Sequence, residues 1–173
     1  MKLRIKSTKL TLQVISWIQI VGGITGLGLI AYLMLKTGAI SGAVLLIFTI
    51  GIGIFGYSIY SGKRLLTDAT KNTAIILSVI NQAIQVFQWS MLGYGFSYSS
   101  GVELILGVQE QTFCFNFAVI TSTFEMSFNS NNDFFIKVNL IAILLIVVLF
   151  NILNELKKEK TASKLKTSHV HTY

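Results

Sequence analysis

Long uncharged runs of hydrophobic residues dominate the pattern along the chain. An α-helix rises 1.5 Å per residue, so about 20 apolar residues cross the roughly 30 Å hydrocarbon core of a bilayer. Four runs are long enough to do so, and the sequence contains no proline that would kink a helix inside them. The pattern therefore predicts four transmembrane helices, at about residues 11–35, 40–61, 73–94 and 134–154.

The segment between the third and fourth expected helices, residues 95–133, follows a different pattern. Apolar and polar residues alternate with period two over much of it, and β-branched and aromatic residues are frequent, as is typical of β-strands. The apolar set changes sides near residues 119–120, which predicts a turn or a bulge there. We expect two or three antiparallel strands over about residues 102–128. Their alternating apolar positions include three phenylalanines: Phe113, Phe115 and Phe117.

These two patterns together predict an all-α integral membrane protein forming a single domain over residues 1–173. A four-transmembrane-helix bundle would carry a small extracytoplasmic antiparallel β-ribbon between its third and fourth helices. The composition agrees, because hydrophobic residues make up 53% of the chain and charged residues only 12%, about half of the share in soluble domains. The first apolar run is too long for a signal peptide, and no small-residue cleavage site follows it.

Basic residues are distributed unequally between the two sides of this four-helix arrangement. Twelve Lys and Arg residues fall at the amino terminus, in the second connection and in the basic tail 155–173, whereas only Lys36 and Lys137 fall on the opposite side. The positive-inside rule therefore predicts an integral plasma (cytoplasmic) membrane protein with both termini in the cytoplasm. The net charge of +7 is then explained by topology and by attraction to anionic lipid, and we expect no binding to nucleic acid.

The third expected helix carries four carboxamides within an otherwise apolar run. At about 100° per residue they fall in an arc of roughly 120°, so they share one face. A carboxamide without a hydrogen-bond partner in hydrocarbon costs several kcal/mol, so this face should meet protein or water. Either it forms hydrogen bonds between helices, or it lines a path for water or a small solute. The residues are Asn81, Gln82, Gln85 and Gln88.

The first two expected helices carry glycines at spacings that allow close packing. Gly22 and Gly26 form a small-xxx-small pattern, and Gly53 and Gly56 share a face of the second helix. We expect the two helices to form a close antiparallel hairpin with small residues on both contact faces.

Residues that could carry out chemistry are few. Cys114 is the only cysteine and has no basic neighbour in the sequence, and His169 and His171 both lie in the tail. Nucleotide-binding, zinc-protease and serine-hydrolase motifs are absent. The sequence therefore predicts a protein that is not an enzyme, with no catalytic residues, metal site or cofactor.

The functional prediction follows from the two surfaces described above. We expect an interaction or accessory subunit of a membrane assembly, in which the phenylalanine-rich ribbon docks a protein partner or a second copy of the chain. The alternative is a component of a small channel or transporter that conducts water or a small solute along the carboxamide face.

Overall fold

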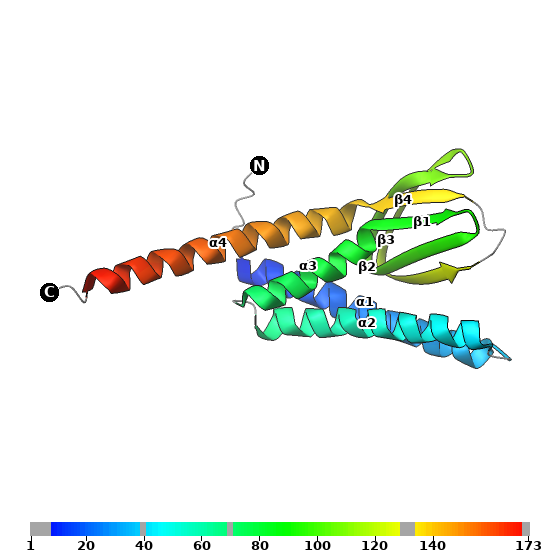
Figure 1. Ribbon diagram of the computed structural model, residues 1–173, viewed down its shortest axis with the longest axis horizontal. Coiled ribbons are helices and arrows are strands. Elements are labelled where there is room, and N and C mark those ends of the chain that lie inside the picture. The colour runs from blue at the N-terminus through cyan, green and yellow to red at the C-terminus, as the bar shows by residue number, and fades with distance from the viewer. Residues whose placement is uncertain (1–7, 39–40, 69–70, 129–133, 171–173) are drawn as a thin grey trace.

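The computed structural model describes residues 8–38, 41–68, 71–128 and 134–170, with the backbone alone for 159–160 and 162–170. Two long antiparallel helices are followed by a shorter helix, a four-stranded antiparallel sheet and a final long helix (Figure 1). In chain order the elements are α1 (Thr8–Lys36), α2 (Gly42–Thr67), α3 (Asn72–Val86), β1 (Phe87–Met91), β2 (Tyr94–Gln109), β3 (Thr112–Ser127), β4 (Phe135–Asn139) and α4 (Leu140–Val170).

The predicted all-α, four-transmembrane-helix bundle is wrong, because the fold is α+β and its sheet is a substantial part of the structure. Within the described residues, three helical segments are long and apolar enough to cross a membrane: α1, α2 and Leu140–Lys158 of α4. Helix α3 has only 15 residues, which is fewer than a bilayer requires.

The third expected span, residues 73–94, is in fact a helix followed by a strand. Phe87 is the C-cap of α3 and already has extended backbone angles, with φ −119° and ψ 126°. From there apolar and polar side chains alternate through β1, and the polar Gln88 and Ser90 are the buried ones. An uncharged apolar run does not by itself distinguish a helix from a buried strand, which explains the error.

The fourth expected span, residues 134–154, likewise begins as a strand, and α4 starts only at Leu140. The side-chain oxygen of Asn139 accepts hydrogen bonds from the backbone N–H groups of Ile141 (3.1 Å) and Ala142 (3.3 Å). Asn139 therefore caps the helix and marks the change from strand to helix.

The strand order in the sheet is β1-β4-β2-β3, so the last strand in the chain lies between the first two. Strand β2 pairs with β3 along almost its whole length and is interrupted by a bulge after Gly101. At this bulge Gly101 of β2 pairs with Thr121 and Val102 pairs with Val119, so Ile120 of β3 has no partner in β2. Gly101 (φ 110°) and Ile120 (φ 57°) both have positive φ. The bulge bends the hairpin and confirms the irregularity predicted near residues 119–120.

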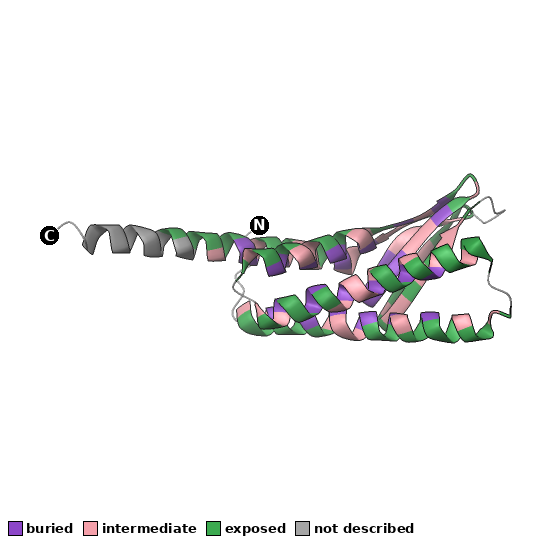
Figure 2. Cartoon of the chain, turned by 60° about the horizontal axis from the view of Figure 1, so that its bottom comes forward, coloured by how far each residue is buried: buried purple, intermediate pink, exposed green. Residues whose placement is uncertain are grey.

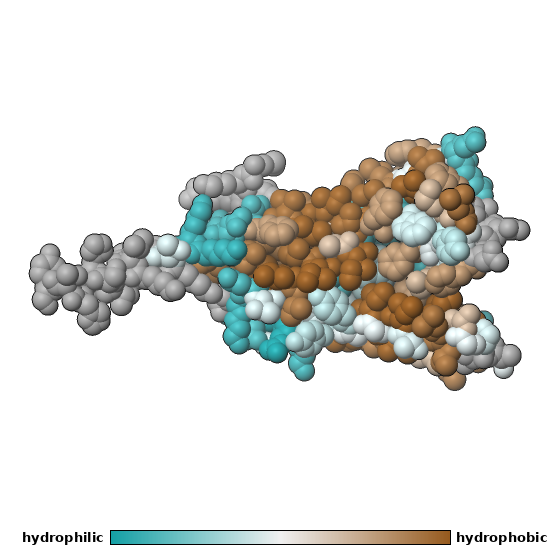
Figure 3. Space-filling view, viewed as in Figure 1, coloured by the Kyte–Doolittle hydropathy of each residue, from teal (hydrophilic) through white to brown (hydrophobic). Residues whose placement is uncertain are grey.

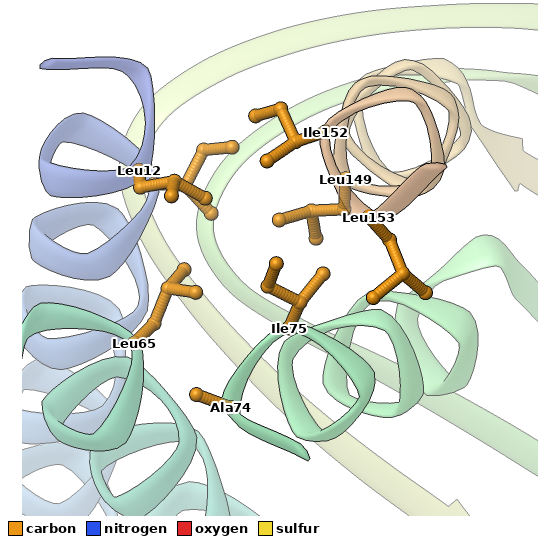
Figure 4. Packing of buried hydrophobic residues seen from close by; sticks show 8 residues of the cluster. Leu12, Leu65, Ala74, Ile75, Leu149, Ile152 and Leu153 are labelled. Atoms are coloured by element: carbon orange, nitrogen blue, oxygen red, sulfur yellow. The ribbon is translucent and has the colours of Figure 1, made fainter. Parts of the chain in front are cut away.

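Two apolar clusters hold the helices and the sheet together. One joins all four helices at the end where α2 leads into α3 (Figure 4): Leu12, Ile15, Leu65, Ala74, Ile75, Leu149, Ile152 and Leu153. The other joins the α1–α2 hairpin to the sheet, where the rings of Phe55 and Tyr98 meet edge to face at 5.3 Å. Buried residues recur along α1 and α2, while other positions of the same helices are exposed (Figure 2).

Much of the exposed surface is apolar. In the view of Figure 3, hydrophobic side chains cover the helices and continue onto the sheet, whereas hydrophilic side chains gather at the α2–α3 end and at the tip of the β2–β3 hairpin. Leu46 of α2, Ile80 of α3 and Leu144 of α4 are each about half exposed. This apolar surface is compatible with association with a membrane.

Candidate functional site

Part of one edge of β2 has no strand beside it and is bound instead by side-chain amides. On this edge β1 pairs with residues 94–96 and β4 with residues 105–109, which leaves the segment between them without a strand partner. The Gln85 side-chain oxygen accepts a hydrogen bond from the backbone N–H of Ser100 at 2.9 Å. The side-chain nitrogen of Gln88 donates to the Tyr98 carbonyl at 3.4 Å.

Asn139 completes this arrangement at the far end of the unpaired segment. Its side-chain oxygen accepts from the backbone N–H of Leu104 at 3.2 Å, in addition to capping α4. An even number of positions separates Tyr98, Ser100 and Leu104 along β2. Their backbone N–H and C=O groups therefore point toward the same edge of the strand. We call Gln85, Gln88 and Asn139 the carboxamide bridge, because they bind the part of the β2 edge that lies between its β1-paired and its β4-paired residues.

A second group of polar side chains lies deeper, where α1, α2, α3 and β2 meet. The Gln19 side-chain oxygen accepts hydrogen bonds from the hydroxyls of Ser61 (3.0 Å) and Ser78 (3.2 Å). Asn81 donates to the hydroxyl of Ser58 at 3.2 Å. All five residues are fully buried. We call them the buried polar cluster, and its contacts link the three helices.

All four carboxamides predicted from the sequence are buried, with at most 5% of each residue exposed. Gln85 and Gln88 belong to the carboxamide bridge and Asn81 to the buried polar cluster. Gln82 differs, because its side chain forms no hydrogen bond within the described part of the chain, and its side-chain nitrogen is buried. The face therefore meets protein; conduction along it stays a prediction.

Sequence reasoning missed one residue of this region, Gln19, and one contact, between Asn139 and Leu104. Gln19 could have been noticed as a carboxamide in the middle of the first apolar run, at a depth where it needs a partner. Asn139 was recognisable as a cap, but its bond to Leu104 depends on a pairing between distant strands that no local pattern reveals.

Only two of the four glycines predicted to pack closely lie at close contacts. A Cβ on Gly22 would overlap the backbone of Ser100 and Gly101, so β2, and not another helix, is what approaches α1 here. A Cβ on Gly26 would overlap the ring of Phe55 in α2. The predicted close packing is wrong for Gly53 and Gly56, because nothing lies within 4 Å of a Cβ at either position.

Strand β3 presents an exposed aromatic face. Phe113, Phe115 and Phe117 are 70%, 65% and 58% exposed. Strand β3 is also the terminal strand of the sheet, so no other described strand pairs with its outer edge. Cys114 lies between two of these phenylalanines as a partly buried free thiol.

Groups for metal chemistry are not assembled in the described residues, where no three His, Cys, Asp or Glu side chains come together. The side chain of His169 is not described, and His171 lies outside the described residues, as do Lys2, Arg4 and Lys6. Comparison of the chain with protein-family models, curated proteins and solved structures gives no match.

The role of Asn139 can be tested by substitution. Asn139→Ala should lower the free energy of unfolding by about 1–3 kcal/mol, because it removes the α4 cap and leaves the Leu104 N–H without its partner. Thermal unfolding of the purified chain in detergent measures the effect. The control is Asn151→Ala in the same α4 helix, because the Asn151 side chain forms no hydrogen bond with the described residues, whereas the Asn139 oxygen accepts three. Equal effects of the two substitutions would contradict the assignment.

Proposed function

We propose that this chain is an integral membrane protein without catalytic activity, which acts as an interaction subunit by binding another membrane protein through β3. The observation that carries the proposal is the combination of an exposed aromatic face with an open strand edge on the same element. Cofactors and metals have no part in this function. The partner is a different protein or a second copy of the chain.

Membrane insertion is supported by the three apolar helices and by the distribution of basic residues. With α1, α2 and α4 crossing the bilayer, the α2–α3 connection and both termini lie in the cytoplasm. Gly22 lies midway along α1, roughly 20 Å from its first residue at 1.5 Å per residue, and it contacts the bend of the sheet. The sheet in this orientation lies beside the outer half of the α1–α2 hairpin, with its bend near the middle of the bilayer.

The position of the sheet explains why β3 needs a partner. Backbone N–H and C=O groups without hydrogen-bond partners cost several kcal/mol each in lipid, so open sheet edges are not left against hydrocarbon. Soluble proteins protect edge strands with proline or charged residues, but residues 112–124 contain neither. A strand from another chain would satisfy this edge and cover the phenylalanines, which is the β-augmentation mode of binding.

The alternative function is conduction of water or a small solute along the carboxamide face of α3. The structural roles of Gln85 and Gln88 favour the interaction function, because both are engaged with the backbone of β2. We therefore expect no flux of ions or small polar solutes when the purified chain is reconstituted in liposomes. A solute flux that Gln85→Leu abolishes would instead support conduction.

Replacement of Phe113, Phe115 and Phe117 by serine tests the interaction function. We expect the triple variant to lose its partner while its thermal unfolding is almost unchanged, because the three rings are exposed and contribute little to folding. The measurement is chemical cross-linking in native membranes followed by purification and mass spectrometry of the bound proteins.

The control replaces three exposed apolar residues of the other hairpin, Met91, Leu92 and Tyr94, by serine. This variant should retain every cross-linked partner. The proposal would be refuted if the phenylalanine variant kept its partners, or if both variants lost them equally.

A further inference from the structure

A cationic hollow lies between the end of α2 and the start of α3. It has a volume of about 240 Å³, which is smaller than pockets for drug-sized ligands. Its lining is polar on one side and apolar on the other: Tyr60, Arg64, Asp68, Lys71, Thr73, Ala74 and Leu77. A second hollow, of about 280 Å³, shares Tyr60 and Arg64 with the first and adds Lys63 and Thr67.

Asp68 pairs with two cations of this site and competes with a ligand for them. Its two carboxylate oxygens contact the Arg64 guanidinium at 3.0 Å and the Lys71 ammonium at 2.9 Å. The hydrogen bond from Lys71, aided by Arg64, lowers the pKa of the Asp68 carboxyl below its ordinary value, so it is ionised at neutral pH. The two cations that line the first hollow, Arg64 and Lys71, exceed this one carboxylate by one charge, and Lys63 of the second hollow adds another.

The cations keep donors for a ligand. Arg64 uses one terminal nitrogen for Asp68 and its Nε for the Tyr60 hydroxyl, at 3.2 Å, which leaves its other terminal nitrogen without a hydrogen-bond partner among the described residues. Lys71 has three N–H donors and one short contact, to Asp68. A group with several negative oxygens would complete these bonds, and arginine binds phosphate well for this reason.

The apolar side of the hollow indicates which phosphate compound binds. Ala74 and Leu77 form that side, and α3 continues from them with the exposed side chains of Ile76 and Ile80. A ligand that fits both sides has an anionic head and a hydrocarbon chain. We propose that this hollow binds the phosphate headgroup of an anionic phospholipid, with the acyl chains lying along α3.

Lipid retention measured by native mass spectrometry tests the proposal. The full chain, purified in detergent, is titrated with phosphatidylglycerol and separately with the zwitterionic phosphatidylcholine. We expect preferential retention of phosphatidylglycerol, and an affinity about twenty-five-fold weaker in the double variant Arg64→Gln/Lys71→Gln, since each cation near the membrane surface contributes about a factor of five. The matched control, Lys157→Gln/Lys158→Gln, removes the same charge from α4 and should change the affinity less than two-fold. Equal losses in the two double variants would overturn the proposal in favour of diffuse attraction.

Two further measurements make the result independent of how well the double variant folds. Asp68→Asn removes the competing carboxylate and should increase phosphatidylglycerol affinity; a decrease or no change would overturn the proposal. Inorganic phosphate at millimolar concentration should not displace the lipid, because it lacks the hydrocarbon chain. Displacement by inorganic phosphate would overturn the lipid assignment and indicate a soluble phosphate compound as the ligand.

Discussion

Gly22→Leu should prevent the chain from reaching its native state. A side chain at this position would overlap the backbone of Ser100 and Gly101, and backbone held in a sheet cannot move aside as a flexible side chain can. Overpacking of a close contact typically costs 1–3 kcal/mol, and here we expect about 3 kcal/mol or more because both neighbours are main chain. The measurement is the yield of monodisperse protein after purification in detergent, together with its unfolding temperature.

Gly28→Leu provides the matched control. Gly28 is in the same helix, and nothing lies within 4 Å of a Cβ placed there. Leucine favours the helix over glycine by up to about 1 kcal/mol, so this variant should be as stable as the parent or slightly more stable. If Gly22→Leu and Gly28→Leu gave the same yield and the same unfolding temperature, the close contact between α1 and the sheet would not be needed for folding.

Gln85→Leu should lower the free energy of unfolding by about 1–3 kcal/mol, the cost of leaving the buried Ser100 N–H without an acceptor. The substitution preserves most of the side-chain volume, so the effect reports the side-chain hydrogen bonds of Gln85, of which the other is donated to the Asn81 carbonyl at 3.2 Å. Amide hydrogen exchange gives a second readout, because the Ser100 amide should lose its protection first, before neighbouring amides that pair with β3.

Gln82→Leu, three residues earlier on the same face, should have the opposite effect. The Gln82 side-chain nitrogen is buried without a partner, so its removal relieves an unfavourable burial and should leave stability unchanged or raised. Comparison of the two variants separates the effect of losing a structural hydrogen bond from the effect of making the face less polar. Equal destabilisation would show that Gln82 has a role that the hydrogen bonds described here do not explain.

The sequence predicted those features whose signal is local. The alternation over residues 102–128 indicated strands, and the change of side near residues 119–120 indicated a turn or a bulge. The carboxamide arc indicated a face that meets protein or water, and its residues are buried against protein. Each of these follows from side chains within a few residues of one another, which is the range over which periodicity is informative.

The features that were not predicted depend on distant parts of the chain. Strands β1 and β4 have five residues each and lie within apolar runs, where a short strand cannot be told from a helix. Their assignment requires knowing that Phe87 pairs with Val138, some fifty residues away. The spacing of Gly22 and Gly26 indicated close approach, but not that a strand approaches at Gly22 and a phenylalanine ring at Gly26.

The place of β4 between β1 and β2 has a consequence for how the protein is made. A ribosome delivers residues 87–127 before residues 135–139, so β1, β2 and β3 emerge while β4, one of the two central strands of the sheet, is still missing. The part of the β2 edge that pairs with β4, residues 105–109, therefore stays open until β4 has been synthesised. Nascent chains truncated before residue 135 should therefore lack a strand that the sheet needs, and they should be held by chaperones or degraded.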